Sequence, residues 1–153
     1  MEFKSRRSHF FVSIISLLFF FSCSETESDA PILVLDAYLK KPLEGALSNV
    51  AYMSLRNSSD YKIKIKGLTC NNLLAEFHQT VIKDSGMLSM NKLNLLTLEP
   101  KSEITLEPGK EHIMLMGKSL SNKIEGINCD LIIEDIDSFP PFKRVPVFFE
   151  IRS

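Results

Sequence analysis

The chain has 153 residues and a formal net charge of −1, with 44% hydrophobic and 24% charged residues. A composition this balanced, without a cluster of basic residues interleaved with aromatic ones, excludes an ordinary nucleic-acid-binding protein. The length suits one compact domain with a sizeable hydrophobic core.

Residues 1–22 are predicted to be a signal peptide. Three basic residues precede the apolar run Phe10–Phe21, which is short for a membrane-spanning helix but typical of a secretion signal. Ser22 and Cys23 follow this run and resemble a bacterial lipobox, which predicts cleavage before Cys23 and lipidation of its thiol. The alternative is an ordinary signal peptide followed by a spare cysteine. Either reading places the protein in the cell envelope, outside the cytoplasm.

Residues 23–31 are predicted to be the lipidated cysteine and a flexible tether. Ser24–Ala30 is polar and acidic, a composition typical of disordered segments. Seven residues span at most about 25 Å when fully extended. We therefore expect a lipid-anchored domain to stay close to its membrane.

Residues 32–153 show the pattern of a β domain. Tyr61–Lys66 alternates strictly, with Ile63 and Ile65 on one face and lysines on the other. Polar turn sequences separate this segment from the others and predict an all-β sandwich. The first strand is predicted to begin at Ile32. The others are predicted at Ala51–Arg56, Leu73–His78, Leu88–Leu98 (one strand or two), Glu103–Leu106, Glu111–Met116, Cys129–Glu134 and Val145–Ile151.

Histidine and methionine are concentrated between residues 78 and 117. Eleven residues separate His78 from Met90, twenty-one separate Met90 from His112, and one separates His112 from Met114. Imidazole nitrogen and thioether sulfur together suit Cu(I). Strand alternation over Glu111–Met116 places His112 and Met114 on one face, so both can reach the same ion.

Each of these residues also has a simpler interpretation. A methionine on a strand usually fills a core, and a single histidine is usually an ordinary polar residue. The joint spacing favours a metal site with His78, Met90, His112 and Met114 as ligands. Met116 shares their face but lies further along, and Met87 is an alternative to Met90, which alone keeps the interval of twenty-one residues.

The spacing resembles the PCu(A)C family of periplasmic copper chaperones, whose signature is His-x10-Met-x21-His-x-Met. The interval from Met90 to Met114 fits without a gap, whereas the first interval has eleven residues in place of ten. One extra residue in the turn at Lys83–Gly86 would account for this difference. The resemblance covers residues 32–151 and implies a cupredoxin-like β-sandwich that binds Cu(I).

The resemblance also implies a role. Members of the family carry copper outside the cytoplasm to the CuA site of cytochrome c oxidase subunit II, often alongside a Sco-type copper protein. Two alternatives stay open: an envelope lipoprotein that sequesters copper without a dedicated client, and a β-sandwich that binds protein partners without metal. We do not expect an enzyme, because no motif of nucleophilic, metalloprotease or nucleotide chemistry stands out, and blue-copper electron transfer needs a cysteine thiolate.

Two cysteines remain if Cys23 carries lipid. Cys70 and Cys129 would lie in an oxidising compartment, where one disulfide is common. The sequence alone does not show whether the two meet in space.

Overall fold

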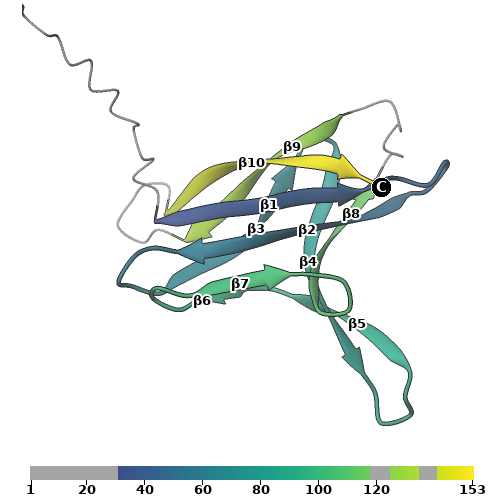
Figure 1. The fold of residues 1–153 in the computed structure, drawn as a ribbon, viewed down its shortest axis with the longest axis horizontal. Coiled ribbons are helices and arrows are strands. Elements are labelled where there is room, and N and C mark those ends of the chain that lie inside the picture. Colours follow the sequence, from purple (N-terminus) through teal and green to yellow (C-terminus); the bar gives the residue numbers. More distant parts are fainter. Residues whose placement is uncertain (1–30, 118–124, 135–140) are drawn as a thin grey trace, which may run out of the picture.

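The computed structural model describes residues 31–117, 125–134 and 141–153 (Figure 1). The predicted signal peptide, Cys23 and the tether up to Ala30 lie outside the described residues. No helix in the described part of the chain is long and apolar enough to cross a membrane. The structure has strands β1 (Ile32–Lys40), β2 (Ser48–Asn57), β3 (Ile63–Cys70), β4 (Leu73–Ile82), β5 (Leu88–Leu93), β6 (Leu96–Leu98), β7 (Glu103–Leu106), β8 (Glu111–Gly117), β9 (Gly126–Glu134) and β10 (Phe142–Arg152).

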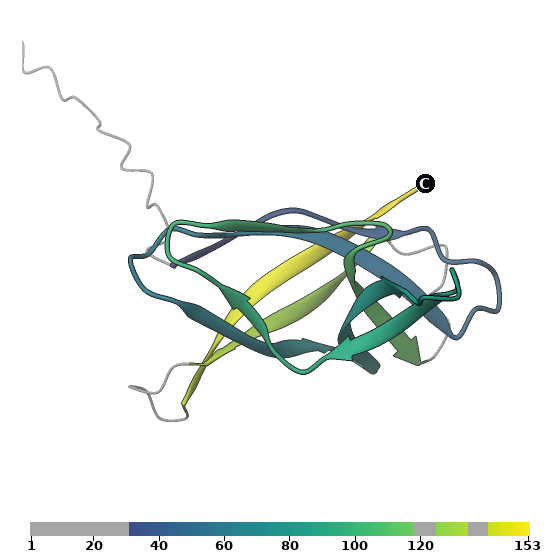
Figure 2. The ribbon, with the colours of Figure 1, turned by 90° about the horizontal axis from the view of Figure 1, so that it is seen from below.

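The strands form a closed barrel, and the prediction of a sandwich was wrong in this respect. Strands β4, β8, β2, β1, β10, β9 and β3 pair in succession, and β3 then pairs with β4 through Cys70 and Leu73. The barrel is mixed, because β1 and β10 run parallel whereas the other pairs are antiparallel. Figure 2 shows the strands around a flattened interior.

Two local features help the sheet to close on itself. Asn72 adopts a left-handed backbone with φ of 59° in the tight turn from β3 to β4, a conformation in which asparagine is enriched. Asp36 has φ of 51° where the register between β1 and β2 shifts, and such a bulge bends a strand. Alternation alone predicts an inner and an outer face for a sandwich and for a barrel, so it could not separate the two.

The interior of the barrel is filled by one face of each wall strand. Leu55 on β2, Ile113 and Leu115 on β8 and Phe149 on β10 are almost completely buried. In each of β2, β8 and β10 the core residues recur at every second position, as alternation predicts. The candidate metal-binding residues of β4 and β8 therefore lie on the outer side of the wall.

A disulfide joins Cys70 at the end of β3 to Cys129 on β9. The two residues are paired across the strands, and both are buried at the edge of the core. This settles the pairing that the sequence left open. Because such bonds persist outside the reducing cytoplasm, the disulfide indicates an extracytoplasmic location.

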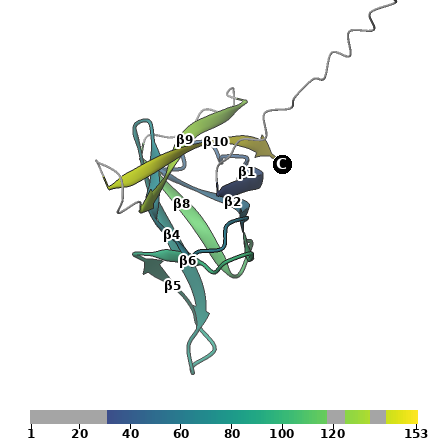
Figure 3. The same cartoon turned by 90° about the vertical axis from the view of Figure 1, so that its left-hand side faces the viewer.

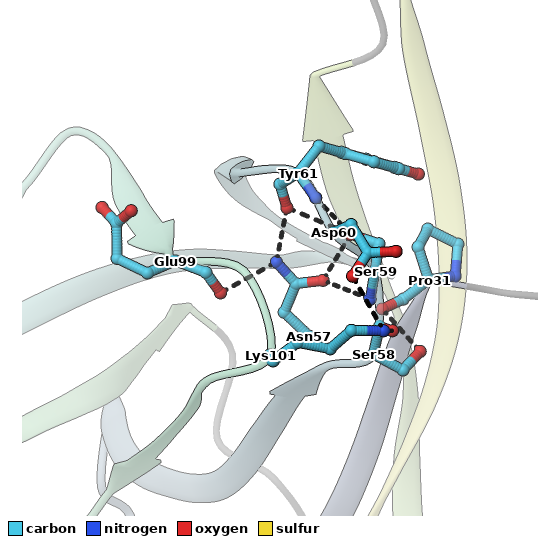
Figure 4. Close-up of polar contacts among 8 residues, drawn as sticks. All are labelled: Pro31, Asn57, Ser58, Ser59, Asp60, Tyr61, Glu99 and Lys101. Carbon is cyan, nitrogen blue, oxygen red and sulfur yellow. Dashed lines mark hydrogen bonds and ion pairs between the residues drawn. The ribbon is translucent and has the colours of Figure 1, made fainter.

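Asn57 ties together the end of the barrel where β1 begins (Figure 4). Its side chain is fully buried, and its amide group donates hydrogen bonds to the carbonyl oxygens of Tyr61 (2.8 Å) and Glu99 (2.9 Å). Its carbonyl oxygen accepts hydrogen bonds from the backbone N–H and the hydroxyl of Ser59, at 2.9 and 2.6 Å. One side chain thus links the turn after β2 to the turn before β7.

The first described residue is held at this same end. The carbonyl oxygen of Pro31 accepts hydrogen bonds from the backbone N–H of Ser58 (2.9 Å) and from its hydroxyl (3.2 Å). Lys101 donates to the carbonyl oxygen of Ser58 at 2.6 Å. The chain therefore enters the barrel beside the Asn57 cluster.

The β4–β5 hairpin projects from the barrel (Figures 1 and 3). β4 pairs with β8 from Leu73 to Gln79, and from Thr80 to Ile82 its ladder pairs are with β5. The predicted end of this strand at His78 was therefore wrong, because pairing with β5 extends β4 to Ile82. The candidate metal centre lies where β4 leaves the wall.

Candidate metal centre

His78 and His112 are directly opposite each other across β4 and β8. Their ring centres are 6.0 Å apart, and His112 is only 4% exposed. Residues paired across antiparallel strands point to the same face of the sheet. The fold thus brings together two histidines that have 33 residues between them in the sequence.

The candidate methionines flank this histidine pair on the same outer face. Met114 is paired with Glu76, two residues from His78 along β4. Met90 on β5 is paired with Thr80, two residues from His78 in the other direction. Both are diagonal neighbours of His78, about 7–8 Å away between Cα atoms and within reach of long side chains. Met90 is 60% exposed, so it lies on the solvent side of the centre.

The two other methionines are placed differently. Met116 is opposite Leu74, two residues beyond Met114 and further from the histidines. Met87 lies in the hairpin turn, where Gly86 has φ of 78° and donates to the carbonyl oxygen of Lys83. Met87 precedes β5 and has no partner in the register of β4 and β5, whereas Met90 is paired beside His78. The register therefore favours Met90 over Met87 as the candidate from this hairpin.

Each histidine has one ring nitrogen engaged and one buried without a partner. His112 Nδ1 donates to the carbonyl oxygen of Lys110 at 3.0 Å, so the lone pair lies on Nε2. His78 Nε2 lies 3.2 Å from a carboxylate oxygen of Glu76 and donates to it, so the lone pair lies on Nδ1. His112 Nε2 and His78 Nδ1 have no hydrogen-bond partner.

This arrangement fits a soft metal ion. Leaving a buried polar atom unpaired costs about 1–3 kcal/mol, and a bound ion would accept both lone pairs. Metal-binding histidines usually donate their second ring N–H to a carboxylate or a carbonyl, as both do here. Among the described residues, no group of three or more His, Cys, Asp or Glu could hold a metal. Met90 and Met114, diagonal neighbours of His78 on the same face, carry sulfur donors of the kind that suits Cu(I).

Glu76 and Lys92 also belong to this centre, although neither was predicted from the sequence. Glu76 bridges His78 and the ammonium group of Lys92, which is itself paired with His78 across β4 and β5. Hydrogen bonds from Lys92 first, and from His78 second, hold the pKa of Glu76 below its ordinary value. Glu76 lies two positions before His78 on β4, and Lys92 lies two positions after Met90 on β5. In a strand, this spacing indicates a side chain on the same face as the candidate ligand.

Solved structures with the same architecture are PCuAC domains. The "Copper-bound PCuAC domain from PmoF2" has a TM-score of 0.63 at 21% identity, over 81% of this chain and 94% of that chain. The "Apo PCuAC domain from PmoF1" has a TM-score of 0.63 at 20% identity, over 81% of this chain and 95% of that chain. "CuI-DR1885 from Deinococcus Radiodurans" has a TM-score of 0.59 at 24% identity, over 80% of this chain and 79% of that chain.

The fold is thus that of a PCuAC domain, and the resemblance inferred from the His/Met spacing is confirmed. No curated protein sequence matches the chain. The family model described as "Putative lipoprotein LpqE-like" matches residues 32–128, which include all four candidate ligands. The chain belongs to this LpqE-like family.

Proposed function

We propose that this protein binds one Cu(I) ion outside the cytoplasm and passes it to another protein, without acting as an enzyme. The ligands are His78, Met90, His112 and Met114. The observation that carries the proposal is the facing pair of buried imidazole nitrogens without partners, His78 Nδ1 and His112 Nε2. Two of the similar solved structures, the PmoF2 domain and DR1885, are copper-bound forms, and this supports the choice of metal.

The unequal exposure of the ligands suits transfer rather than permanent storage. His112 is buried in the wall, whereas Met90 lies on the projecting hairpin and is largely exposed. An incoming protein can displace an exposed thioether without disturbing the barrel. Met90 is therefore the ligand that we expect to leave first during transfer.

The proposed client is the CuA site of cytochrome c oxidase subunit II, with a Sco-type protein as a further partner. This assignment extends the family resemblance and requires the protein to lie at the oxidase membrane. Membership of a lipoprotein family and the disulfide support an anchored, extracytoplasmic protein. We propose Cys23 as the lipid-bearing residue. Mass spectrometry of the N-terminus tests this, since an unmodified Cys23 or cleavage elsewhere would remove the anchor from the proposal.

Copper titration followed by transfer tests the function. The purified protein should bind one equivalent of Cu(I) against a competing chelator with ascorbate present, and the His78→Ala/His112→Ala variant should not. The loaded protein should then metallate an apo-CuA fragment of the oxidase. Binding without transfer would favour the sequestering lipoprotein, and failure to bind would favour a protein-binding module without metal.

A further inference from the structure

Glu76 occupies a position between the candidate metal centre and a fixed positive charge. One carboxylate oxygen accepts the hydrogen bond from His78 Nε2 at 3.2 Å, and the other is ion-paired with Lys92. The side chains of Glu76 and His78 are 17% and 16% exposed, so water competes only weakly for their contact. Lys92 reaches Glu76 from the neighbouring strand β5. The carboxylate is therefore held on one side by His78 and on the other by Lys92.

The chemistry of this contact determines which nitrogen of His78 can bind metal. An ionised carboxylate accepts hydrogen bonds but cannot donate them. Glu76 therefore stabilises the tautomer with the proton on Nε2, fixes the ring orientation and leaves the Nδ1 lone pair available. Such outer partners also raise the basicity of the ligand, and their loss typically weakens metal binding by about 10- to 100-fold.

Lys92 controls what else the carboxylate can do. A free carboxylate beside two imidazoles would add an oxygen ligand, and oxygen and nitrogen donors suit Zn(II) and Cu(II) better than Cu(I). The ion pair occupies the oxygen of Glu76 that does not contact His78. It thereby keeps the carboxylate in its outer position and the site rich in sulfur.

We propose that Glu76 is a positioning residue that presents His78 Nδ1 to the metal, and that Lys92 preserves selectivity for Cu(I) by preventing Glu76 from becoming a ligand. This inference rests on the proposed function, because it assigns roles around the same copper site. It adds two residues outside the His/Met motif.

The role of Glu76 is tested with a graded pair of substitutions. Glu76→Gln keeps an oxygen acceptor without the charge, and Glu76→Leu removes the acceptor. Cu(I) affinity should fall by about 10- to 100-fold in Glu76→Leu and by less in Glu76→Gln. In the copper-free protein, nitrogen NMR should show His78 protonated on Nε2 in the parent and mixed between tautomers in Glu76→Leu, with His112 unchanged in both.

Glu111→Leu is the matched control for this pair. Glu111 is one residue from His112 and accepts a hydrogen bond from Gln79 at 2.9 Å, so it belongs to the adjacent cross-strand pair. Its side chain falls on the other face by alternation, and its loss should leave Cu(I) affinity and the histidine signals unchanged. Parent-like affinity and tautomer in Glu76→Leu would overturn the role of Glu76. If the parent itself binds no Cu(I), the proposed function fails instead.

The role of Lys92 is tested by metal selectivity. Lys92→Gln should raise Zn(II) affinity about tenfold, a change of the size expected for one metal-site contact, and should therefore lower the ratio of Cu(I) affinity to Zn(II) affinity. Adding Glu76→Gln should abolish the gain. Lys62→Gln is the control, because Lys62 is 52% exposed against 53% for Lys92 and pairs with Glu99 far from the site. Equal Zn(II) affinity in the parent and Lys92→Gln would overturn this role.

Discussion

His78 and His112 face each other across β4 and β8, and each holds one ring nitrogen in a hydrogen bond while the other is buried without a partner. The hydrogen bonds differ, because His78 donates to the side chain of Glu76 and His112 to the backbone of Lys110. A side-chain partner can be changed by mutation, whereas a backbone carbonyl cannot. The two histidines should therefore differ in their sensitivity to nearby substitutions.

Removing a ligand should weaken copper binding more than removing an outer partner does. We expect His112→Ala and Met114→Ala each to lower Cu(I) affinity by more than about 100-fold, the upper end of the range for outer partners. Met116→Ala is the control, since Met116 lies on the same strand and face, two residues beyond Met114 and further from the histidines. Competition with a Cu(I) chelator measures all three, and parent-like affinity in the His112→Ala/Met114→Ala variant would show that the site is misassigned.

Asn57→Ala should destabilise the barrel strongly. The substitution removes a fully buried side chain and leaves the carbonyl oxygens of Tyr61 and Glu99 without their donor. We expect a loss of about 2–4 kcal/mol in the free energy of unfolding, from unpaired buried groups. Urea denaturation measures it, with the exposed Asn94→Ala as control. Equal midpoints for the two variants would contradict this account of Asn57.

Removing the disulfide should lower stability but leave the metal centre formed. Cys70 and Cys129 are 59 positions apart, and a cross-link closing a loop of that length is expected to contribute about 4 kcal/mol, mainly by restricting the unfolded chain. The Cys70→Ala/Cys129→Ala variant should unfold at lower urea concentration. Its Cu(I) affinity under native conditions should equal that of the parent, because neither cysteine belongs to the site. If this variant still folds but no longer binds copper, the disulfide also shapes the metal centre.

Glu134 should make stability depend on pH. Hydrogen bonds from Lys66 and then Lys64 lower the pKa of its carboxyl group in the folded protein. Its contribution is therefore present above the unfolded pKa of about 4.3 and is lost as pH falls through the lower, folded value. Between neutral pH and pH 3, the parent should lose more stability than Glu134→Gln. Denaturation at several pH values measures this, and Glu44→Gln, at an exposed position in the loop after β1, is the control.

The sequence predicted the local features well. The alternation in Tyr61–Lys66 and Glu111–Met116 appears in β3 and β8, and the apolar stretch Leu88–Leu98 forms two strands. The common face of His112 and Met114 also follows from alternation. These features were predictable because each depends on neighbouring residues.

Features that depend on distant parts of the chain were not predictable in the same way. Closure of the barrel requires β1 to pair with β10, as in the pair Tyr38 and Glu150, and no local pattern encodes a pairing between residues so far apart in the sequence. The linking role of Asn57 was not predicted, because its partner Glu99 lies 42 residues away. Glu76 was overlooked because its importance depends on Lys92, which only the register of β5 brings near.

The attachment of Pro31 to Ser58 has a mechanical consequence. If the preceding chain is held at a membrane, a pull on it arrives at a residue that is already hydrogen-bonded to the barrel. Behind Pro31, β1 is paired with β2 on one side and with β10 on the other, so a pull along β1 loads many ladder hydrogen bonds at once rather than one after another. The β4–β5 hairpin contributes no pair to the ladders of β1. Tension on the anchor would therefore be carried through the barrel wall while the hairpin stays unloaded.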